Sequence, residues 1–534
     1  MERRLSLAIL IIACALPFLR IGIGEIQPWD ESLYVVRAQA CLQFGAWLDQ
    51  TPYAIGHLYS ATHPPFGIWL IAISKLIFGS GTSAVRFPIA LLSSAGIFVF
   101  WLLLRKFTSG TAALIGAVSV ASSDLFLALS HRAQMEMPVF ALGIASIYFL
   151  ILSIERDRLW LSLLAGSMLG LGLLTKFGFA LFVVPFLLLL PWIFPKKNAY
   201  LYVGLAVVLG VAIAAPWFLM MSANHPDYWP HVLGSLTILE EGAYAPSHLA
   251  WWYYFNRLFV ALPLIVVVIA MRDKGRALVA SVVWLLLLLA GLQLIGTKMA
   301  HFAFVLLAPG GMIVALGWEH LMERPKPWRA AVLVLLGIAF AWSISEQVRL
   351  LATGRLRWNA TAVLPETIIV LVITIIATSL ILFKASVQTR YALGFCVLLL
   401  GVAIGHLISQ QDAVFMLGAR RTAAVAFSVP QKNTIVLIHP DFPNEEYAPQ
   451  LAYYTDGWTL GWLPGKYSNA ITWQRAAGSS YVPDPSTEIA IVSHFEDRFN
   501  PRSLETETLW NELIGKLRQK FSQEKDFRCY TVFY

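Results

Sequence analysis

Residues 159–221 read LWLSLLAGSMLGLGLLTKFGFALFVVPFLLLLPWIFPKKNAYLYVGLAVVLGVAIAAPWFLMM, and this stretch decides the fold class. Apolar runs alternate in it with short basic breaks: 159–175, Lys176, 177–194, Lys196-Lys197 and 199–221. The hydrocarbon core of a bilayer is about 30 Å thick and needs roughly 20 apolar residues per helix. Inside it, every backbone polar group must be hydrogen-bonded within its own segment. Each run therefore predicts a transmembrane helix.

The rest of the chain repeats this pattern. Of its 534 residues, 58% are hydrophobic and 13% are charged, and the mean hydropathy is +0.67, which excludes an ordinary soluble globule. About thirteen windows meet the criterion for a span: 5–23, 84–104, 110–129, 135–154, 159–175, 177–194, 199–221, 251–270, 277–296, 299–317, 329–346, 363–383 and 391–408. The sequence thus predicts an α-helical polytopic membrane protein.

The basic residues predict the topology. With the N-terminus in the cytoplasm, Lys and Arg fall at every cytoplasmic turn, from Arg105-Lys106 onward, as the positive-inside rule requires. The net charge of +8 could also indicate nucleic-acid binding, but these residues form short clusters between apolar runs rather than one basic face. Arg3 and Arg4 before an apolar run resemble a signal peptide, yet no cleavage site follows, so we expect an uncleaved first helix. We expect a bacterial inner-membrane protein.

Two long loops and a C-terminal segment lie outside the membrane in this topology. The transmembrane domain covers 1–411 and carries the outer loops 24–83 and 222–250. In the first loop, a helix is expected from Asp30 to about Phe44 and a short interfacial helix from Pro65 to Phe78, which is too short to span.

Residues 412–534 have mixed polar and apolar composition and predict a soluble extracytoplasmic α/β domain. Its strands are expected at 434–438, 488–492 and 530–534, and its helix at 504–521. A disulfide between Cys41 and Cys529 is conceivable, but the sequence gives no geometry for it.

A charge near hydrocarbon is costly and usually functional. The ionisable residues next to the predicted spans collect on the outer side. They are Asp30, Glu31, His63, His131, Arg132, Glu136, Lys176, Lys298 and His301. Such a mixture suits the transfer of a sugar from a lipid phosphate, in which a carboxylate takes the proton of the acceptor hydroxyl and cations stabilise the departing phosphate.

The roles can be assigned within this chemistry. Asp30 is the first choice for the base, and Glu136 is the second carboxylate, which orients the acceptor or shares the base role. The cationic side chains are candidates for the donor phosphate: His63, Arg132, Lys176 and Lys298.

Each signal also has a plain structural interpretation. Asp30 suits a helix cap, and His63 before Pro64-Pro65 suits a rigid turn. Lys176 and Lys298 suit lysines that extend to lipid headgroups. The histidines show no tight ligand spacing on one helix face, so we predict no metal site, and a divalent cation on the donor phosphate is left open.

Seven short motifs occur in one order over roughly residues 1–310. They are Trp29-Asp30-Glu31 with Tyr34, His63-Pro64-Pro65 with Trp69, Arg86-Phe87-Pro88, Arg132 with Glu136 and Pro138, 170–176, His248 before 251–254, and Gly296-Thr297-Lys298 before Pro309. As a set they resemble the GT-C fold glycosyltransferases, in the branch of the aminoarabinose transferases of lipid A, the bacterial relatives of protein O-mannosyltransferases and the Rgt-type transferases.

The resemblance implies a polyprenyl-phosphate sugar donor, inversion at the sugar carbon and a catalytic acid at Asp30, with the second acid at Glu136 where Asp is usual. It also implies substrate contacts by Glu31, Tyr34, His63, Arg132, Lys176, Lys298 and His301. The chain departs from the family at Thr62-His63, where relatives carry Glu-Lys, and at Phe302, where many carry Tyr, which leaves His63 and His301 as partial replacements.

Two other functions compete with this one. A transporter or flippase of lipid-linked glycans fits the number of spans, but the deep segments are almost uncharged. An O-antigen ligase or polymerase would share the location but not the acid pair of the first loop. The sequence leaves open the sugar, the acceptor (lipid A, another glycolipid, a glycan or a protein), the metal requirement and the oligomeric state.

Overall fold

The computed structural model describes residues 2–23, 26–27, 30–54, 58–237, 275–295, 299–322, 393–401, 403–404, 434–438, 488–493, 504–526 and 530–534. These residues belong to two compact units. The helical unit comprises 1–21, 63–70 and 86–412, and the second unit comprises 22–62, 71–85 and 413–534. The predicted domains, 1–411 and 412–534, stay a prediction.

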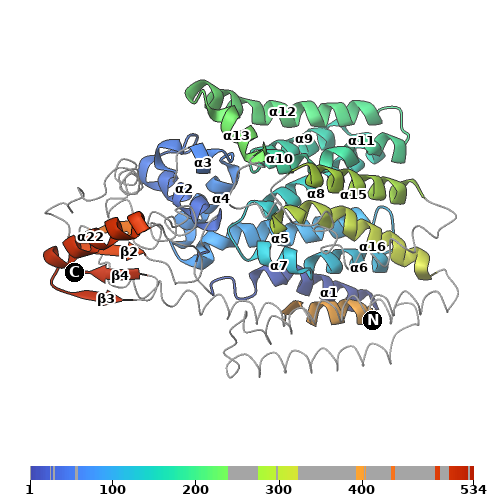
Figure 1. Ribbon diagram of the computed structural model, residues 1–534. Coiled ribbons are helices and arrows are strands. Elements are labelled where there is room, and N and C mark those ends of the chain that lie inside the picture. Colours follow the sequence, from blue (N-terminus) through green and yellow to red (C-terminus); the bar gives the residue numbers. More distant parts are fainter. Residues whose placement is uncertain are drawn as a thin grey trace. The chain divides into compact units, whose positions relative to one another are not determined.

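The described residues form mostly helices (Figure 1). In the first half of the chain these are α1 (Glu2–Ala15), η1 (Leu16–Phe18), α2 (Asp30–Phe44), η2 (Thr51–Tyr53), α3 (Leu58–Ala61), α4 (Phe66–Phe78), α5 (Thr82–Leu104), α6 (Gly110–Ala121), α7 (Asp124–Ser130), α8 (Glu136–Arg156), α9 (Leu159–Leu173), α10 (Phe177–Ala180), η3 (Leu181–Val183), α11 (Val184–Ile193), α12 (Ala199–Asn224) and α13 (Tyr228–Thr237). Later elements are α15 (Arg276–Leu294), η5 (Ala300–Leu306), α16 (Leu307–Met322), β1 (Thr434–Ile438), β2 (Ile489–Ser493), α22 (Leu504–Lys520), β3 (Glu524–Asp526) and β4 (Tyr530–Phe533).

Several helices are apolar and long enough to cross a membrane. Within the described residues there are five, or six if one bent pair counts as a span: α5, α8, α12, α15, His301–Leu321 and the pair α6 with α7. Shorter apolar helices occupy the windows at 5–23, 159–175 and 177–194. The predicted windows 251–270, 329–346 and 363–383 lie outside the described residues, so the total of about thirteen stays a prediction.

The window 110–129 is not one straight helix. It breaks into α6 and α7, which are bent by 63°. Ser122 ends α6, and the hydroxyl of Ser123 accepts a hydrogen bond from the backbone N–H of Phe126 at 3.3 Å, which starts α7. A serine that caps the next helix competes with continuing the first one, which explains the break.

Small residues bring neighbouring helices close together. Helices α9 and α12 run side by side (Figure 1). A Cβ added at Gly166 would lie 2.7 Å from the carbonyl oxygen of Ala206, and one at Gly170 would lie 2.9 Å from that of Gly210. These glycines are four residues apart, the spacing that lets backbones approach in membrane helices.

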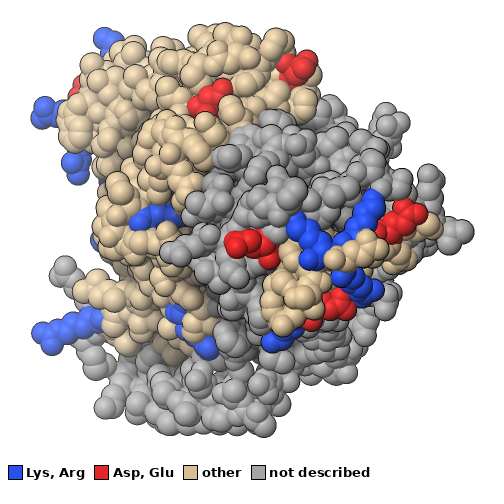
Figure 2. Space-filling model, turned by 90° about the vertical axis from the view of Figure 1, so that its left-hand side faces the viewer, with Lys and Arg blue, Asp and Glu red and all other residues tan. Residues whose placement is uncertain are grey.

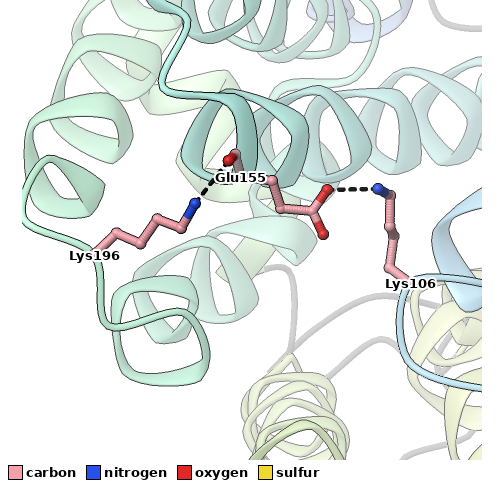
Figure 3. A network of polar contacts seen from close by, with 3 residues as sticks. All are labelled: Lys106, Glu155 and Lys196. Atoms are coloured by element: carbon pink, nitrogen blue, oxygen red, sulfur yellow. Dashed lines mark hydrogen bonds and ion pairs between the residues drawn. The ribbon is translucent and has the colours of Figure 1, made fainter.

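A polar network joins three loops at the end of α8. Lys106 donates to the carboxylate of Glu155 at 2.5 Å, and Lys196 donates to the backbone carbonyl of Glu155 at 2.7 Å (Figure 3). The loops of these lysines are both predicted to be cytoplasmic. Since α8 has 21 residues, Glu155 lies about 30 Å along the helix from Glu136, about the thickness of a hydrocarbon core.

In the second unit, the predicted helix from Asp30 to Phe44 is confirmed as α2. The helix ends at Gly45, whose φ of 68° is in the left-handed region that glycine adopts readily. Gln50 fixes the connector that follows, because its side chain accepts from Arg37 at 2.7 Å and donates to the carbonyl of Ala46 at 2.8 Å. The helix predicted at 65–78 is α4, and its last turn exposes Leu76, Ile77 and Phe78. Its interfacial position stays a prediction.

Cys41 on α2 is a free thiol, and Cys529, its possible disulfide partner, lies outside the described residues. Burial raises the pKa of Cys41 to about 11, and only about one molecule in a thousand carries the thiolate at pH 8. We expect iodoacetamide to label Cys41 of the folded protein at pH 8 at least about tenfold more slowly than that of the unfolded chain. A variant that lacks the other three cysteines makes the measurement specific, and equal rates would contradict it.

The C-terminal elements include a four-stranded sheet in the order β1-β2-β4-β3, with β1 and β2 parallel and the other pairs antiparallel. The strands predicted at 434–438, 488–492 and 530–534 correspond to β1, β2 and β4, and the predicted helix corresponds to α22. Strand β3 was not predicted because Glu524, Lys525 and Asp526 have no apolar alternation. On the face drawn in Figure 2, described residues of both charge signs lie next to each other in the cluster at the right, whereas those along the left edge are mostly Lys and Arg.

Candidate active site

A buried ion pair lies at the first residue of α8. The ammonium of Lys176 donates to Oε1 of Glu136 at 2.6 Å, and the side chains of the lysine and the glutamate are 9% and 0% exposed. Lys176 lies in the turn between α9 and α10, and both helices pack on α8. A charge buried this deeply requires an opposite charge nearby, and the pair meets that requirement.

Hydrogen bonds to backbone carbonyl groups hold the turn that carries Lys176. The N–H of Lys176 donates to the carbonyl of Gly172 at 3.2 Å, and the hydroxyl of Thr175 donates to that of Leu171 at 2.7 Å. The N–H of Phe66, at the start of α4, donates to the carbonyl of Leu174 at 2.9 Å. The segment after His63-Pro64-Pro65 is therefore attached to the turn that positions the lysine.

His301 and two aromatic rings complete the surroundings. Nε2 of His301 lies 3.8 Å from Oε1 of Glu136, and its side chain is 26% exposed. The ammonium of Lys176 lies 5.2 Å from the centre of the Phe179 ring, within the range of a cation–π contact. Phe302 joins these groups, because its ring contacts both His301 and Phe179. The ion pair thus has an apolar wall and a half-buried histidine at its edge.

The second oxygen of Glu136 is the unusual atom of this site. Within the part of the chain that the structure describes, Oε2 is buried and has no hydrogen-bond partner. A buried acceptor without a donor costs roughly 1–3 kcal/mol, more for a charged group, so native proteins rarely keep one without a reason. Oε1 accepts from Lys176 and lies 3.8 Å from His301, whereas Oε2 has no donor among the described residues.

Other predicted residues of the helical unit lie on the connecting segments. Arg132 is half-buried in the loop between α7 and α8, four residues before Glu136, and His63 is half-buried in the turn before α4. His131, beside Arg132, is part of the framework. Its ring nitrogens lie 3.1 Å from the carbonyl oxygen of Leu19 and 2.8 Å from that of Leu127, and burial lowers its pKa.

The predicted residues of the first loop belong to the second unit. Asp30 and Glu31 are in the first turn of α2, where the helix dipole favours negative charge. Asp30 is half-buried, whereas Glu31 is fully buried and accepts a hydrogen bond from the N–H of Gln27 at 2.6 Å. Tyr34 is buried one turn later. Lys298 lies outside the described residues.

The direct pairing of Lys176 with Glu136 was not predicted from the sequence, because the lysine was assigned to the donor phosphate. A signal was present. Lys176 stands alone between two apolar runs, and a lysine in that position needs a carboxylate unless it reaches water. Glu136 lies at the outer end of the preceding pair of predicted spans, so it was one of the acids that could have been paired with this lysine. Phe179 was missed because an apolar residue inside an apolar run carries no distinguishing pattern.

Comparison with known families points to one group of proteins. A family model described as dolichyl-phosphate-mannose-protein mannosyltransferase matches residues 62–219, a stretch that contains His63, Arg132, Glu136 and Lys176. The site described above therefore lies largely inside the matched region.

Curated relatives have related names. The chain is 29% identical over 352 residues to the undecaprenyl phosphate-alpha-4-amino-4-deoxy-L-arabinose arabinosyl transferase of Pseudomonas savastanoi pv. phaseolicola, an alignment that covers 63% of this chain and 64% of the relative. It is 28% identical over 243 residues to the protein of the same name from Edwardsiella ictaluri, covering 44% and 43%. The alignments thus span 64% and 43% of these relatives, less than two thirds of either.

Solved structures show the same fold. Crystal structures of ArnT from Cupriavidus metallidurans, in the apo state and bound to undecaprenyl phosphate, match with TM-scores of 0.68 and 0.69 at 15% identity, covering 99% of this chain and 97% of theirs. At this identity the match bears on the fold alone. Together with the apolar helices and the family match, it shows that the chain is an integral membrane protein of the GT-C fold that resembles the aminoarabinose transferases and the protein mannosyltransferases.

Proposed function

We propose that this protein is an inverting glycosyltransferase that moves a sugar from a polyprenyl-phosphate donor to an extracytoplasmic acceptor. One observation carries the proposal. A fully buried carboxylate, Glu136, is held by Lys176 through one oxygen while the other oxygen has no donor among the described residues. The names of the curated relatives support undecaprenyl phosphate as the lipid of the donor.

In this proposal Glu136 orients the acceptor. Oε2 accepts a hydrogen bond from the acceptor hydroxyl, which directs a lone pair of that oxygen toward the sugar carbon. Lys176 holds the carboxylate in place, since it donates to Oε1 at 2.6 Å. An ammonium has three N–H donors, so the same lysine can also face an oxygen of the donor phosphate. Because the acceptor is oriented when it binds, less translational and rotational entropy is lost in the chemical step, and the barrier is lower.

Asp30 is the proposed general base. The acceptor oxygen attacks the sugar carbon from the face opposite the phosphate, and the bond between that carbon and the phosphate oxygen breaks. The hydroxyl proton passes to Asp30, and polyprenyl phosphate leaves with the bonding electrons. The position of Asp30 in the first turn of α2 supports this role, because the helix dipole favours a negatively charged side chain there.

The leaving phosphate needs positive charge near it. We propose Arg132, His63, Lys298 and His301 for this task, with Glu31 and Tyr34 supporting Asp30. The proposed location is a bacterial inner membrane, with the N-terminus cytoplasmic and residues 412–534 outside. The separation of Glu136 from the basic loops at the other end of α8 supports this orientation, since the two sets are about 30 Å apart along the helix.

Reconstituted protein can test the proposal. We expect vesicles that contain the protein and undecaprenyl-phosphate aminoarabinose, as a probe donor, to release undecaprenyl phosphate when an acceptor such as lipid A is added, measured by mass spectrometry. Asp30→Asn should lower the rate at least about tenfold, since a general base contributes this much or more. Asp227→Asn is the matched control, because Asp227 is exposed on the helical unit.

The outcomes separate the parts of the proposal. Transfer by wild type and by Asp30→Asn at equal rates would reject Asp30 as the base but keep the function. If neither this donor nor a mannosyl donor is consumed with any extracted cell-envelope acceptor, the glycosyltransferase assignment is wrong. The same assay with EDTA decides whether the donor phosphate needs a divalent cation. Mass analysis of lipids and glycans from cells that lack the chain identifies the natural acceptor.

A further inference from the structure

Six cations gather on three loops of the helical unit, far from the candidate active site. They are Arg105 and Lys106 after α5, Arg156 and Arg158 between α8 and α9, and Lys196 and Lys197 between α11 and α12; we call them the basic collar. The loops are joined by the contacts of Glu155 with Lys106 and Lys196 (Figure 3). The rings of Phe107 and Phe194, 5.8 Å apart, join two of the same loops.

The acids beside the collar are already engaged. The carboxylate of Glu155 is bound by Lys106. That of Asp157 accepts from the hydroxyl of Tyr202 at 2.7 Å and from Asn198 at 2.9 Å, and these bonds lower the pKa of Asp157. Glu319 accepts from the backbone N–H of Ser109 at 3.1 Å. The region thus contains six cations and three acids, and each acid is already bound by the groups named above.

Three collar cations, Arg156, Arg158 and Lys197, are exposed and form no ion pair with an acid among the described residues. Their positive charge is therefore available at the surface. Positive charge alone would attract many different anions. The side chains next to the three cations therefore decide which anion fits.

Exposed apolar and aromatic side chains follow these cations directly. Leu159 and Trp160 come after Arg158 and are 50% and 60% exposed, while Tyr200 and Leu201 come after Lys197 and are 75% and 57% exposed. A similar pair lies near Lys196, where the guanidinium of Arg276 is 5.9 Å from the ring of the exposed Trp192. Aromatic rings beside cations are typical of the level where headgroups meet acyl chains.

We propose that the basic collar binds the headgroups of anionic phospholipids, whose acyl chains lie along the exposed residues of α9, α11 and α12. A phospholipid is the anion that uses both features, because its phosphate meets the cations and its chains cover Trp160 and Leu201. A free phosphate would leave the apolar surface uncovered. The contacts of Glu155 with Lys106 and Lys196 (Figure 3) fix the segments that carry the cations before the lipid arrives, which lowers the entropy lost on binding.

Native mass spectrometry of the full chain tests the proposal. Protein exchanged into mixed vesicles of phosphatidylglycerol and phosphatidylcholine, then released into detergent, should retain phosphatidylglycerol in preference to phosphatidylcholine. In the variant Arg156→Gln/Arg158→Gln/Lys197→Gln the retained ratio should fall at least about tenfold, since a cation near an anionic surface contributes roughly fivefold. The matched control, Lys516→Gln/Lys520→Gln/Lys525→Gln, removes the same charge from the second unit and should keep the wild-type ratio.

A second measurement covers the case in which the variant is unstable. Phosphatidylglycerol added to delipidated wild-type protein should raise its Tm, whereas the same concentration of inorganic phosphate should not. An equal effect of phosphate would mean that the collar is a simple anion site and would overturn the proposal, as would equal lipid ratios in wild type and the collar variant. Neither measurement depends on the glycosyltransferase activity.

Discussion

Replacing Glu136 by Gln is expected to lower the rate of sugar transfer by roughly 10²- to 10³-fold, because the amide keeps the shape of the side chain but removes its charge and turns one oxygen into a donor. The affinity for the donor should change much less, since the proposed role of Glu136 is to orient the acceptor. The measurement is kcat and KM for donor and acceptor separately. The conservative variant Glu136→Asp should retain transfer to within about tenfold, as it keeps the carboxylate.

The partner lysine separates the catalytic role of Glu136 from its structural role. Glu136→Gln removes the charge of the carboxylate that binds Lys176, and loss of one member of a buried pair typically costs about 3–5 kcal/mol. The double variant Glu136→Gln/Lys176→Met also removes the charge of the lysine, so its Tm should recover toward wild type while transfer stays low. Activity that returns together with the Tm would show that Glu136 only supports the fold.

The second large effect concerns the packing of α6 on α16. A Cβ at Gly116 would lie 2.6 Å from the backbone oxygen of Gly311 and 2.9 Å from Cβ of Ala315, and neither atom can rotate away. Gly116→Ala is therefore expected to destabilise the protein by about 2–4 kcal/mol, because the two helices must separate. Unfolding followed by tryptophan fluorescence in detergent measures this.

Gly204→Ala is the matched control for this substitution. Gly204 lies in the exposed face of α12, and nothing lies within 4 Å of a Cβ added there. Alanine has the higher helix propensity, so this variant should be as stable as wild type or more stable by about 0.5–1 kcal/mol. Equal stability of the two variants would show that α6 and α16 are less closely packed than the structure has them.

Several elements could be predicted because their causes are local. The apolar windows depend on about 20 consecutive residues, the helix from Asp30 to Phe44 on its own flanking residues, and the strand 434–438 on a short β-branched run. The break at Ser122-Ser123 also has a local cause, but it was not predicted. The mean hydropathy of a window of about 20 residues stays high when the window contains two serines. Short β3 was missed for the opposite reason, since its pairing with β4 and not its composition makes it a strand.

The amino-acid sequence by itself thus determined that the chain is a membrane protein, where many of its helices lie, and which ionisable residues flank the spans on one side. These properties follow from the free energy of transferring each segment from water to hydrocarbon, and this free energy depends on the composition and length of the segment. Only the tertiary structure decided that Lys176 binds Glu136, 40 residues away in sequence, and that the other oxygen of that carboxylate has no donor among the described residues. Such a pairing depends on how α8, α9 and α10 pack, because hydrogen bonds act over about 3 Å and no periodicity of the chain records which side chains come that close.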